Sequence, residues 1–346
     1  MRKTLIAIIL LTILLSGCNF PLSRELSPTV IPISDLLINQ HSKYPPTPTP
    51  FQPIPPTPTP GLLPTIVDPG ETDQAGIPVE TSPATAPILV KPEGQVNILL
   101  LGSDWREGSS FRTDVLLLVS LNKITGTATL LSFPRDLYVE IPGIGMTRIN
   151  AAYPYGGFEL TSATFMNNFG IEIDYYMLTN FYGFIGIVDT LGGIDVNAAS
   201  ALYDLCILPQ AVNDHCYVPA GISHLNGRTA LWYVRSRHAS NDFDRTRRAQ
   251  EVLIAIFQKA MSLDALSRGT ELYNLFQSSV ETNIPVGAVL ELLPMGSKIL
   301  SDPTLIRRYA ITSAHVSNYI VPGTGAMVLV PNKALVDEVI RQALSQ

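Results

Sequence analysis

The chain has 346 residues and a formal net charge of −6, and only 15% of its residues are charged. This length allows one large domain or two small ones, and 46% hydrophobic residues are enough for a substantial core. The net acidity argues against a general nucleic-acid-binding protein, because such proteins normally carry a basic stripe on a basic domain.

The N-terminus has the layout of a secretory signal. Arg2 and Lys3 precede an apolar run, Leu5 to Leu15, that is too short to span a bilayer comfortably. The run ends in "LSGC", and cleavage before Cys18 resembles the bacterial lipobox, in which this cysteine becomes the lipidated first residue. We therefore predict a lipoprotein signal peptide over 1–17. The alternative is an uncleaved anchor, and both hypotheses place the rest of the chain outside the cytoplasm.

A proline- and threonine-rich segment follows. It includes "YPPTPTPFQPIPPTPTPG", and proline favours the extended polyproline II conformation, which makes a semi-rigid spacer. We predict an extracytoplasmic tether over 18–92 and a folded domain over 93–346.

Strand and helix patterns alternate through the folded domain. Three short apolar runs, "VNILLLG", "VLLLVSLN" and "ATLLSF", predict buried strands. A helix is expected to end at Gly170 with a left-handed cap, and the later segments predict, in order, strand "YYMLTN", helices "FYGFIGIVDTLGG", "NGRTALWYVRSR" and Asp244 to Met261, strand "RRYAIT" and helix "NKALVDEVIRQAL". This alternation predicts an α/β domain with a mixed central β-sheet covered by helices on both faces.

Two cysteines lie within the predicted domain. Outside the cytoplasm a pair of cysteines usually forms a disulfide, and Cys206 and Cys216 are separated by a short loop. No CxxC-type spacing supports a zinc site. We predict a structural disulfide.

The segment "YVRSRHASNDFDRTRRAQ" places five arginines within 233–250. On a helical wheel, Arg245 falls in the apolar stripe of the helix, Arg248 and Gln250 lie at its margins, and Arg247 points to solvent. A buried guanidinium needs a partner, and a helix N-terminus favours an anion. Arginine also suits bidentate contacts to phosphate.

Two interpretations of this arginine cluster remain open. The arginines, with Arg235 and Arg237, form a socket for a multiply charged anion, or they are neutralised by Asp242 and Asp244 as internal ion pairs.

A second charged cluster surrounds the first two predicted strands. Asp104 and Arg106 follow the first strand, and Arg112 and Asp114 precede the second, so the pairs are expected to meet at one rim of the sheet. Two carboxylates beside a phosphate suit Mg²⁺, although local Asp–Arg salt bridges explain the spacing equally well. Further candidates follow the third strand, where an α/β sheet tends to place its ligand crevice: Arg135, Asp136 and, more weakly, Arg148.

Other catalytic motifs are missing from the sequence. It contains no GxSxG elbow, no P-loop and no HExxH, and no GxGxxG follows a strand. These absences argue against a serine hydrolase or a nucleotide-binding enzyme.

Six ordered segments between Val96 and Phe257 together resemble the LytR–CpsA–Psr family. They are "NILLLGSDWR", "FRTDVLLLVSLN", "LLSFPRDLYVEIPG", "RINAAYPYGG", "VDTLGGIDV" and "LNGRTALWYVRSRH…DFDRTRRAQ". The resemblance implies an extracytoplasmic bacterial phosphotransferase. Such enzymes transfer glycopolymers, for example teichoic acid, from a polyprenyl-pyrophosphate carrier to a peptidoglycan hydroxyl, which creates a phosphodiester link.

The resemblance also implies roles for individual residues. Asp104 and Asp114 match magnesium-binding aspartates, and the polyprenyl chain is expected in an apolar pocket. The positions that match those around the pyrophosphate are Arg106, Arg112, Arg135, Arg235, Arg237, Arg245, Arg248 and Gln250. Two departures are visible: Ala249 stands where the family often has glutamine, and a lipoprotein signal replaces the usual transmembrane helix.

Two other functions use the same features. A polyprenyl-diphosphate pyrophosphatase would use the same socket with water as acceptor. A non-catalytic polyprenyl-phosphate carrier or wall-binding lipoprotein would bind the lipid without needing Asp104 and Asp114. The older label of some family members as transcriptional regulators does not suit an acidic chain with a lipobox.

Overall fold

The computed structural model describes residues 88–104, 112–237, 242–262 and 279–345. The chain divides into two units, and all described residues belong to the unit Ile77–Gln346. The predicted signal peptide, Cys18, most of the predicted tether and Arg106 lie outside the described residues.

A six-stranded sheet forms the centre of the fold, with the strand order β11-β6-β1-β2-β3-β12. β1 pairs in parallel with β6, and β3 pairs in parallel with β12, while the other neighbours are antiparallel. The sheet is therefore mixed, as predicted. Its strands are β1 (Gln95–Ser103), β2 (Thr113–Asn122), β3 (Thr127–Phe133), β6 (Tyr175–Asn180), β11 (Val280–Thr282) and β12 (Ile306–Ala310).

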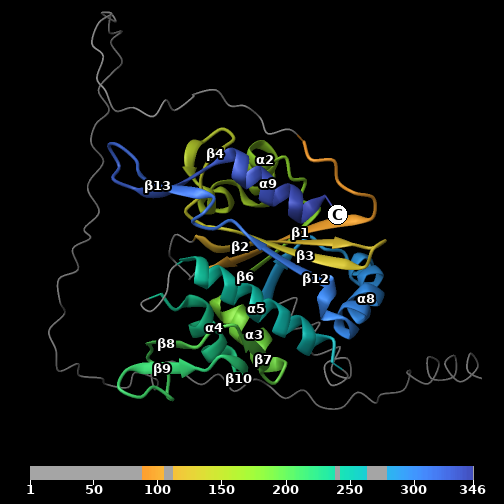
Figure 1. Ribbon diagram of the computed structural model, residues 1–346, viewed down its shortest axis with the longest axis vertical. Helices are drawn as coiled ribbons and strands as arrows, with labels where there is room; N and C mark the ends of the chain where they lie inside the picture. The colour runs from red at the N-terminus through yellow and green to blue at the C-terminus, as the bar shows by residue number, and fades with distance from the viewer. Residues whose placement is uncertain (1–87, 105–111, 238–241, 263–278, 346) are drawn as a thin grey trace, which may run out of the picture. The chain divides into compact units, whose positions relative to one another are not determined.

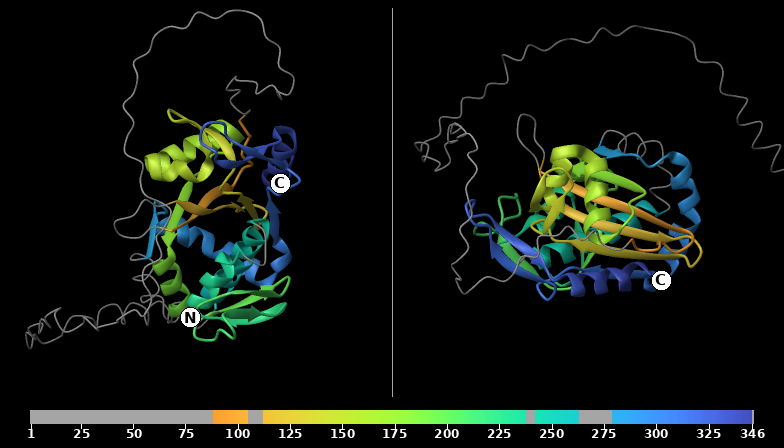
Figure 2. Two further views of the ribbon diagram at one scale, coloured as in Figure 1. Left: turned by 90° about the vertical axis from the view of Figure 1, so that its left-hand side faces the viewer. Right: turned by 90° about the horizontal axis from the view of Figure 1, so that it is seen from above.

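Helices cover both faces of this sheet, which confirms the predicted architecture (Figure 1). One face carries α2 (Ala152–Phe169) and α9 (Lys333–Leu344). The opposite face carries α3 (Phe181–Thr190), α4 (Gly227–Arg235) and α5 (Asp242–Ala260), and α8 (Val286–Ser301) packs near the start of β3. Figure 2 shows the same layering from two further directions.

The larger core lies between the sheet and the α2–α9 layer. Alternate residues of the central strands point into it, because successive strand side chains face opposite sides. They include Leu99 and Leu101 of β1, which pack with Phe133 of β3 and with Phe165 of α2. The rings of Phe133 and Phe165 meet edge to face at 4.9 Å. Apolar burial of this kind is the main stabilising contribution to the sheet.

Glycines shape the helix before β6 at two places. Gly170 is left-handed (φ 66°, ψ 19°), and its N–H bonds to the Met166 carbonyl, so the predicted cap is confirmed. α2 begins at Ala152, and the pair Gly156–Gly157 forms a kink inside it. Gly157 has φ 63° and ψ −152°, a conformation open essentially to glycine alone.

Short antiparallel hairpins and two 3₁₀ turns complete the fold. The paired strands are too brief to show hydrophobic periodicity, so the sequence patterns do not predict them. They are β4 (Tyr138–Ile141) with β5 (Gly145–Arg148), β7 (Ile194–Ala198) with β10 (Gly221–Leu225), β8 (Leu202–Leu205) with β9 (His215–Val218), and β13 (Val316–Ile320) with β14 (Met327–Pro331). The 3₁₀ turns are η2 (Ile149–Ala151) and η3 (Pro303–Leu305).

A disulfide joins Cys206 and Cys216 across the β8–β9 hairpin, with Cα atoms 5.6 Å apart. The sequence spacing had suggested this pair. Among the described helices, none is both long and apolar enough to cross a membrane.

Candidate active site

The first site element is the rim where β1 ends and β2 begins. Ser103 lies opposite Thr113 after a register shift, so Asp104 and Asp114 come to the same edge of the sheet, as expected. Asp104 accepts a hydrogen bond at Oδ1 from the backbone N–H of Arg112 (2.7 Å). The backbone N–H of Asp104 in turn donates to the Arg112 carbonyl (3.2 Å). These contacts hold the Asp104 carboxylate in place next to β2.

Arg135 joins this rim from the turn that follows β3. Its Nη1 lies 2.6 Å from Asp114 Oδ1, and its Nε lies 3.3 Å from Asp136 Oδ2. Asp136 also lies 3.3 Å from the Nε of Arg148. The segment after β3 therefore carries a small charge network, in which Asp136 links two candidate arginines.

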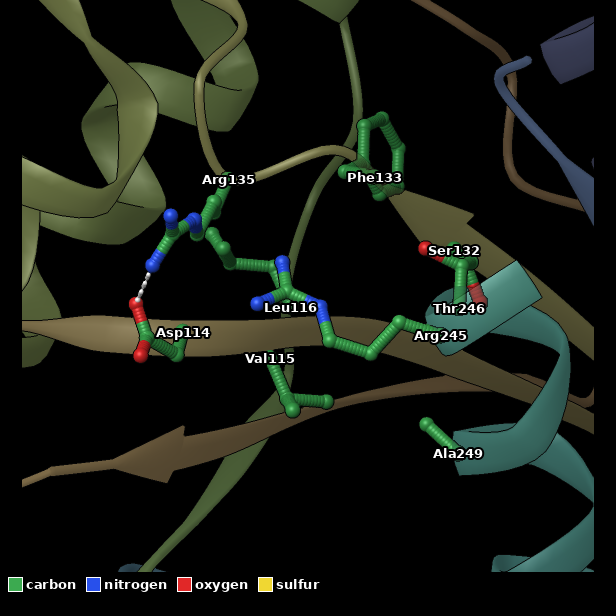
Figure 3. Close-up of a pocket in the computed structure, with 9 residues that line it drawn as sticks. All are labelled: Asp114, Val115, Leu116, Ser132, Phe133, Arg135, Arg245, Thr246 and Ala249. Atoms are coloured by element: carbon green, nitrogen blue, oxygen red, sulfur yellow. Dashed lines mark hydrogen bonds and ion pairs between the residues drawn. The ribbon is translucent and has the colours of Figure 1, made fainter. Parts of the chain in front are cut away.

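The first turns of α5 supply the third part of the site. Arg245 is 6% exposed and lines a small pocket together with Asp114 and Arg135. Figure 3 shows the Arg245 side chain extending from the helix toward the Arg135–Asp114 pair. The sequence-based prediction that Arg245 points inward is therefore correct. We call this cavity the arginine pocket; its other lining residues are Val115, Leu116, Ser132, Phe133, Thr246 and Ala249.

The described lining of the arginine pocket carries more positive than negative charge. It contains two guanidinium groups and one carboxylate. The N-terminal end of a helix adds a positive partial charge. Guanidinium groups bind phosphate oxygens through two parallel hydrogen bonds, which gives orientation as well as affinity. The arrangement therefore suits a phosphate or diphosphate anion.

Arg248 is buried one turn further along α5, with only 1% exposure. Its Nη2 donates to the carbonyl oxygen of Ser236, and its guanidinium lies 5.7 Å from the centre of the Tyr233 ring. Burial lowers the pKa of Arg248, because the charged form loses hydration there. This arginine anchors Ser236, the residue after α4, and it is not among the lining residues of the arginine pocket.

Three other predicted residues lie apart from the arginine pocket. Arg235 is exposed and stacks over the Phe181 ring at 4.1 Å, and Arg237 is exposed. Arg148 donates two hydrogen bonds to the Met327 carbonyl, at 3.2 and 2.7 Å. None of the three is among the lining residues of the arginine pocket.

The Gln250 amide is engaged inside the protein. Its Nε2 donates to Ser132 Oγ and to the Tyr309 carbonyl, both at 2.8 Å, and its Oε1 accepts from Arg308 Nε at 3.0 Å. The wheel placed Gln250 at the edge of the buried stripe, and it is 3% exposed. Its amide connects a wall of the arginine pocket to β12.

Arg247 differs from its expected solvent-facing position. It lies outside the arginine pocket, as predicted, but its Nη1 is 2.6 Å from Glu251 Oε1, and the Glu251 side chain is only 2% exposed. The wheel prediction that Arg247 is an ordinary surface residue is therefore wrong. It neutralises a buried carboxylate that also accepts a hydrogen bond from Tyr233. Asp244 Oδ1 lies 3.8 Å from Arg247 Nη2, and the Asp242 side chain lies outside the described residues.

Comparisons with known proteins agree with these features. The model of the LytR_cpsA_psr family matches residues 70–343. The chain belongs to the LytR–CpsA–Psr family.

Individual relatives are about one third identical to this chain over the part that aligns. The Oceanobacillus iheyensis protein named polyisoprenyl-teichoic acid–peptidoglycan teichoic acid transferase TagU is 33% identical over 213 residues, 59% of this chain and 64% of TagU. The Staphylococcus aureus regulatory protein MsrR is 32% identical over 205 residues, 58% of this chain and 60% of MsrR. The chain thus spans less than two thirds of these relatives.

Solved structures of the family share the fold. The crystal structure of Bacillus subtilis TagV superposes with a TM-score of 0.60 and 29% identity, over 73% of this chain and 98% of TagV. The structure of TagT bound to LIIa-WTA superposes with a TM-score of 0.56 and 26% identity, over 73% of this chain and 92% of TagT.

The sequence analysis did not identify Arg308, the partner of Gln250, as a residue near the site, because Arg308 lies in β12 beyond the family-like segments. Its Nη2 also donates to the Arg247 carbonyl at 3.3 Å. Burial lowers the pKa of Arg308, as it does for Arg248. The pair Arg307–Arg308 in β12 gives no signal of its own, and only the parallel pairing of β12 with β3 brings Arg308 to α5.

Proposed function

We propose that this protein transfers a glycopolymer from a polyprenyl-pyrophosphate carrier to a sugar hydroxyl of peptidoglycan, which forms a phosphodiester link. The single observation that carries the proposal is the arginine pocket, where Arg135 and Arg245 face one carboxylate, Asp114. The name of its relative TagU, which describes transfer of teichoic acid to peptidoglycan, supports the same chemistry. This function places the folded domain on the outer side of the membrane.

The proposed reaction is a single displacement at phosphorus. The acceptor hydroxyl oxygen bonds to the phosphorus next to the glycan, and the bond from that phosphorus to the bridging oxygen breaks, so polyprenyl phosphate leaves. The hydroxyl proton passes to a base, for which a rim aspartate is the candidate. Arg135 and Arg245 stabilise the negative charge that spreads over the phosphoryl oxygens. A guanidinium fixed before the reaction is effective because it does not have to reorganise.

The rim aspartates fit Mg²⁺ as a cofactor. Among the described residues, the contacts above use Oδ1 of Asp104 and Oδ1 of Asp114, and the second oxygen of each carboxylate is the candidate ligand for a metal. Within the described residues no cluster of three or more His, Cys, Asp or Glu side chains forms a metal cage. Mg²⁺ commonly takes one or two carboxylates together with substrate phosphates, and it supplies positive charge at the phosphoryl oxygens.

The face of the sheet that carries α5 supports a site for the lipid chain. Leu99 and Leu101 fill the opposite core, so Leu100 of β1 points to this side, as do Val115 and Val119 of β2. All three keep partial exposure although they lie in central strands. Incompletely covered apolar side chains under a helix layer suit an aliphatic chain.

The predicted lipid anchor at Cys18 and the tether complete the proposal. Cys18 lies outside the described residues, and the anchor is an expectation from the "LSGC" sequence. Lipidation would keep the domain near the membrane that holds the carrier.

Transfer in a purified system tests the proposed function. The full-length chain, lipid-linked glycan, Mg²⁺ and peptidoglycan are incubated, and attached polymer is measured for wild type and Arg135→Ala. The matched control is Arg341→Ala, which removes an exposed α9 arginine that pairs with Glu338. We expect attachment with wild type and the control, and a large loss with Arg135→Ala. Equal yields from all three proteins contradict the proposal, and release of glycan without attachment identifies a pyrophosphatase.

A further inference from the structure

The β8–β9 hairpin carries apolar side chains that nothing in the described structure covers. We define the hairpin tip as residues 205–212, "LCILPQAV". Ile207 is 101% exposed, Val212 is 70% exposed, and Leu205 is 46% exposed. A contiguous group of exposed aliphatic side chains usually marks a surface that binds a protein or a membrane.

The composition of the hairpin tip is unusual for a surface turn. None of its eight residues is charged, whereas surface turns are normally polar. The polar residues of this turn, Asn213 and Asp214, come only after the tip, and both are exposed. The adjoining Asp204 is only 2% exposed, and its Oδ2 accepts a hydrogen bond from Ser236 Oγ at 2.6 Å. The charge nearest to the tip on β8 is therefore directed inward.

Two tyrosines lie behind the apolar tip. Tyr203 of β8 and Tyr217 of β9 are directly opposite each other in the register, and they are 56% and 61% exposed. Tyrosine prefers the headgroup level of a bilayer, whereas aliphatic side chains prefer the greater depth of the acyl chains. The hairpin thus presents an aliphatic tip first and an aromatic pair behind it, in the order that a bilayer interface accommodates.

The hairpin is held in this shape by fixed contacts. The Cys206–Cys216 disulfide closes it, and Trp232 of α4 donates from Nε1 to the Leu205 carbonyl at 2.8 Å. These constraints keep the tip from folding back onto the domain. Less conformational freedom is then lost when the tip meets a surface.

The same contacts connect the hairpin to the arginine segment. Ser236 bonds through its hydroxyl to Asp204 and through its carbonyl to Arg248. Its neighbours Arg235 and Arg237 are exposed, and positive side chains next to an apolar tip favour anionic lipid headgroups.

We propose that the hairpin tip docks on the surface of a lipid bilayer by shallow insertion of Ile207 and Val212. This inference rests on the proposed function, because a polyprenyl-pyrophosphate carrier is presented from the membrane surface. Docking would bring the end of α4, where Ser236 bonds to Asp204 of the hairpin, close to that surface.

A bilayer explains the hairpin better than a glycan chain does. Glycan-binding sites use open aromatic faces, whereas one face of the Tyr203 ring is already stacked on His215, with centroids 4.6 Å apart and planes at 6°. The most exposed tip side chains are aliphatic, and they offer no hydrogen bonds to sugar hydroxyls.

Vesicle binding tests the proposal. The chain from residue 19 onward, which lacks both the apolar signal run and the predicted lipidation site Cys18, is co-sedimented with vesicles of phosphatidylethanolamine and phosphatidylglycerol. We compare it with the same chain carrying Ile207→Asp and Val212→Asp. Each lost apolar insertion is expected to weaken vesicle binding about tenfold or more. The matched control is Ile222→Asp on β10, where the side chain is 78% exposed but lies outside the hairpin.

A second measurement does not depend on loss of binding. The substitution Ile207→Trp is expected to shift the fluorescence emission to shorter wavelength when vesicles are added, because the indole enters a less polar environment. No shift, equal sedimentation of the double variant, or loss in the Ile222→Asp control overturns the proposal. Sedimentation with peptidoglycan but not with vesicles overturns it as well and identifies a wall-binding surface.

Failure of docking and failure of the proposed function give different results. If docking is correct, the double variant loses transfer from a carrier embedded in vesicles but keeps transfer from a short-chain, water-soluble carrier. If wild type binds vesicles through the tip but transfers neither substrate, the proposed function fails and docking stands.

Discussion

The arginine pocket and the hairpin tip both depart from the usual distribution of residues. The pocket encloses charged side chains, whereas the tip exposes apolar ones. The pocket keeps Arg245 almost fully buried, and Asp114 and Arg135 are largely enclosed, whereas the tip leaves Ile207 and Val212 in solvent. Burying a charge costs free energy that paired groups must offset, and exposed apolar surface costs free energy in water. The two proposals above therefore assign ligands of opposite character to the two regions: a phosphorylated anion to the pocket and a lipid surface to the tip.

The two regions also differ in how they are built. The arginine pocket collects side chains from β2, from the turn after β3 and from α5, which are far apart in the sequence. The hairpin tip is a single continuous segment closed by one disulfide. A change in the pocket should therefore affect activity, whereas a change in the hairpin should affect local stability and docking.

The largest expected effect comes from Arg245→Ala. We expect transfer to fall about 100- to 1000-fold, as is typical when one fixed donor to a developing charge is removed. The midpoint of thermal unfolding, measured alongside the transfer assay, should change little. A variant that keeps activity would contradict the role given to the arginine pocket.

Arg248→Ala should have the opposite outcome, in which stability is lost and the pocket itself is not changed directly. Arg248 is among the largest fully buried side chains and bonds to the Ser236 carbonyl. Its truncation leaves a cavity and removes a charged hydrogen bond, so the free energy of unfolding should fall by about 2–4 kcal/mol. Denaturant unfolding measures this loss. If Arg245→Ala destabilises the protein equally, the distinction between pocket and anchor is wrong.

Removal of the disulfide should have a smaller effect. Cys206 and Cys216 are 10 positions apart, so replacing both by serine should lower the free energy of unfolding by about 2–3 kcal/mol. Vesicle binding should weaken as well, because the tip loses its fixed shape. Transfer from a water-soluble carrier, measured with the same variant, should remain.

The smallest expected effect comes from an ordinary ion pair near the start of β1. Lys91 Nζ lies 2.7 Å from Asp174 Oδ1 and 3.2 Å from Glu172 Oε2. Burial opposes the charged form, but these carboxylates outweigh it and raise the pKa of Lys91 above its usual 10.5. The stabilisation is present below about pH 10.5 and is lost as the pH rises above the folded-state pKa.

Lys91→Met should therefore lower the free energy of unfolding by only about 0.5–1 kcal/mol at neutral pH. The difference from wild type should disappear in strongly alkaline solution. A loss as large as that of Arg248→Ala would show that surface pairs contribute more here than we infer.

Periodicity and turn chemistry were sufficient to predict the main elements. The apolar runs gave β1, β2 and β3, Gly170 marked the end of α2, and the amphipathic pattern gave α5 within two residues at each end. The short hairpins were not predictable in this way, because strands of four or five residues carry too few alternations. Arg247 was misplaced for a related reason: a helical wheel shows direction but does not show that Glu251 is buried beside it.

The sequence by itself determined the alternation of strands and helices, the pairing of Cys206 with Cys216 and the family, because these depend on local pattern and residue order. Only the tertiary structure decided which charged groups meet. Arg245 reaches the pocket with Asp114 and Arg135. Arg248 instead donates to the Ser236 carbonyl, and the Gln250 amide donates to Ser132. Those contacts depend on how distant strands and helices pack. Exposure of the hairpin tip likewise became visible only once the rest of the domain was in place.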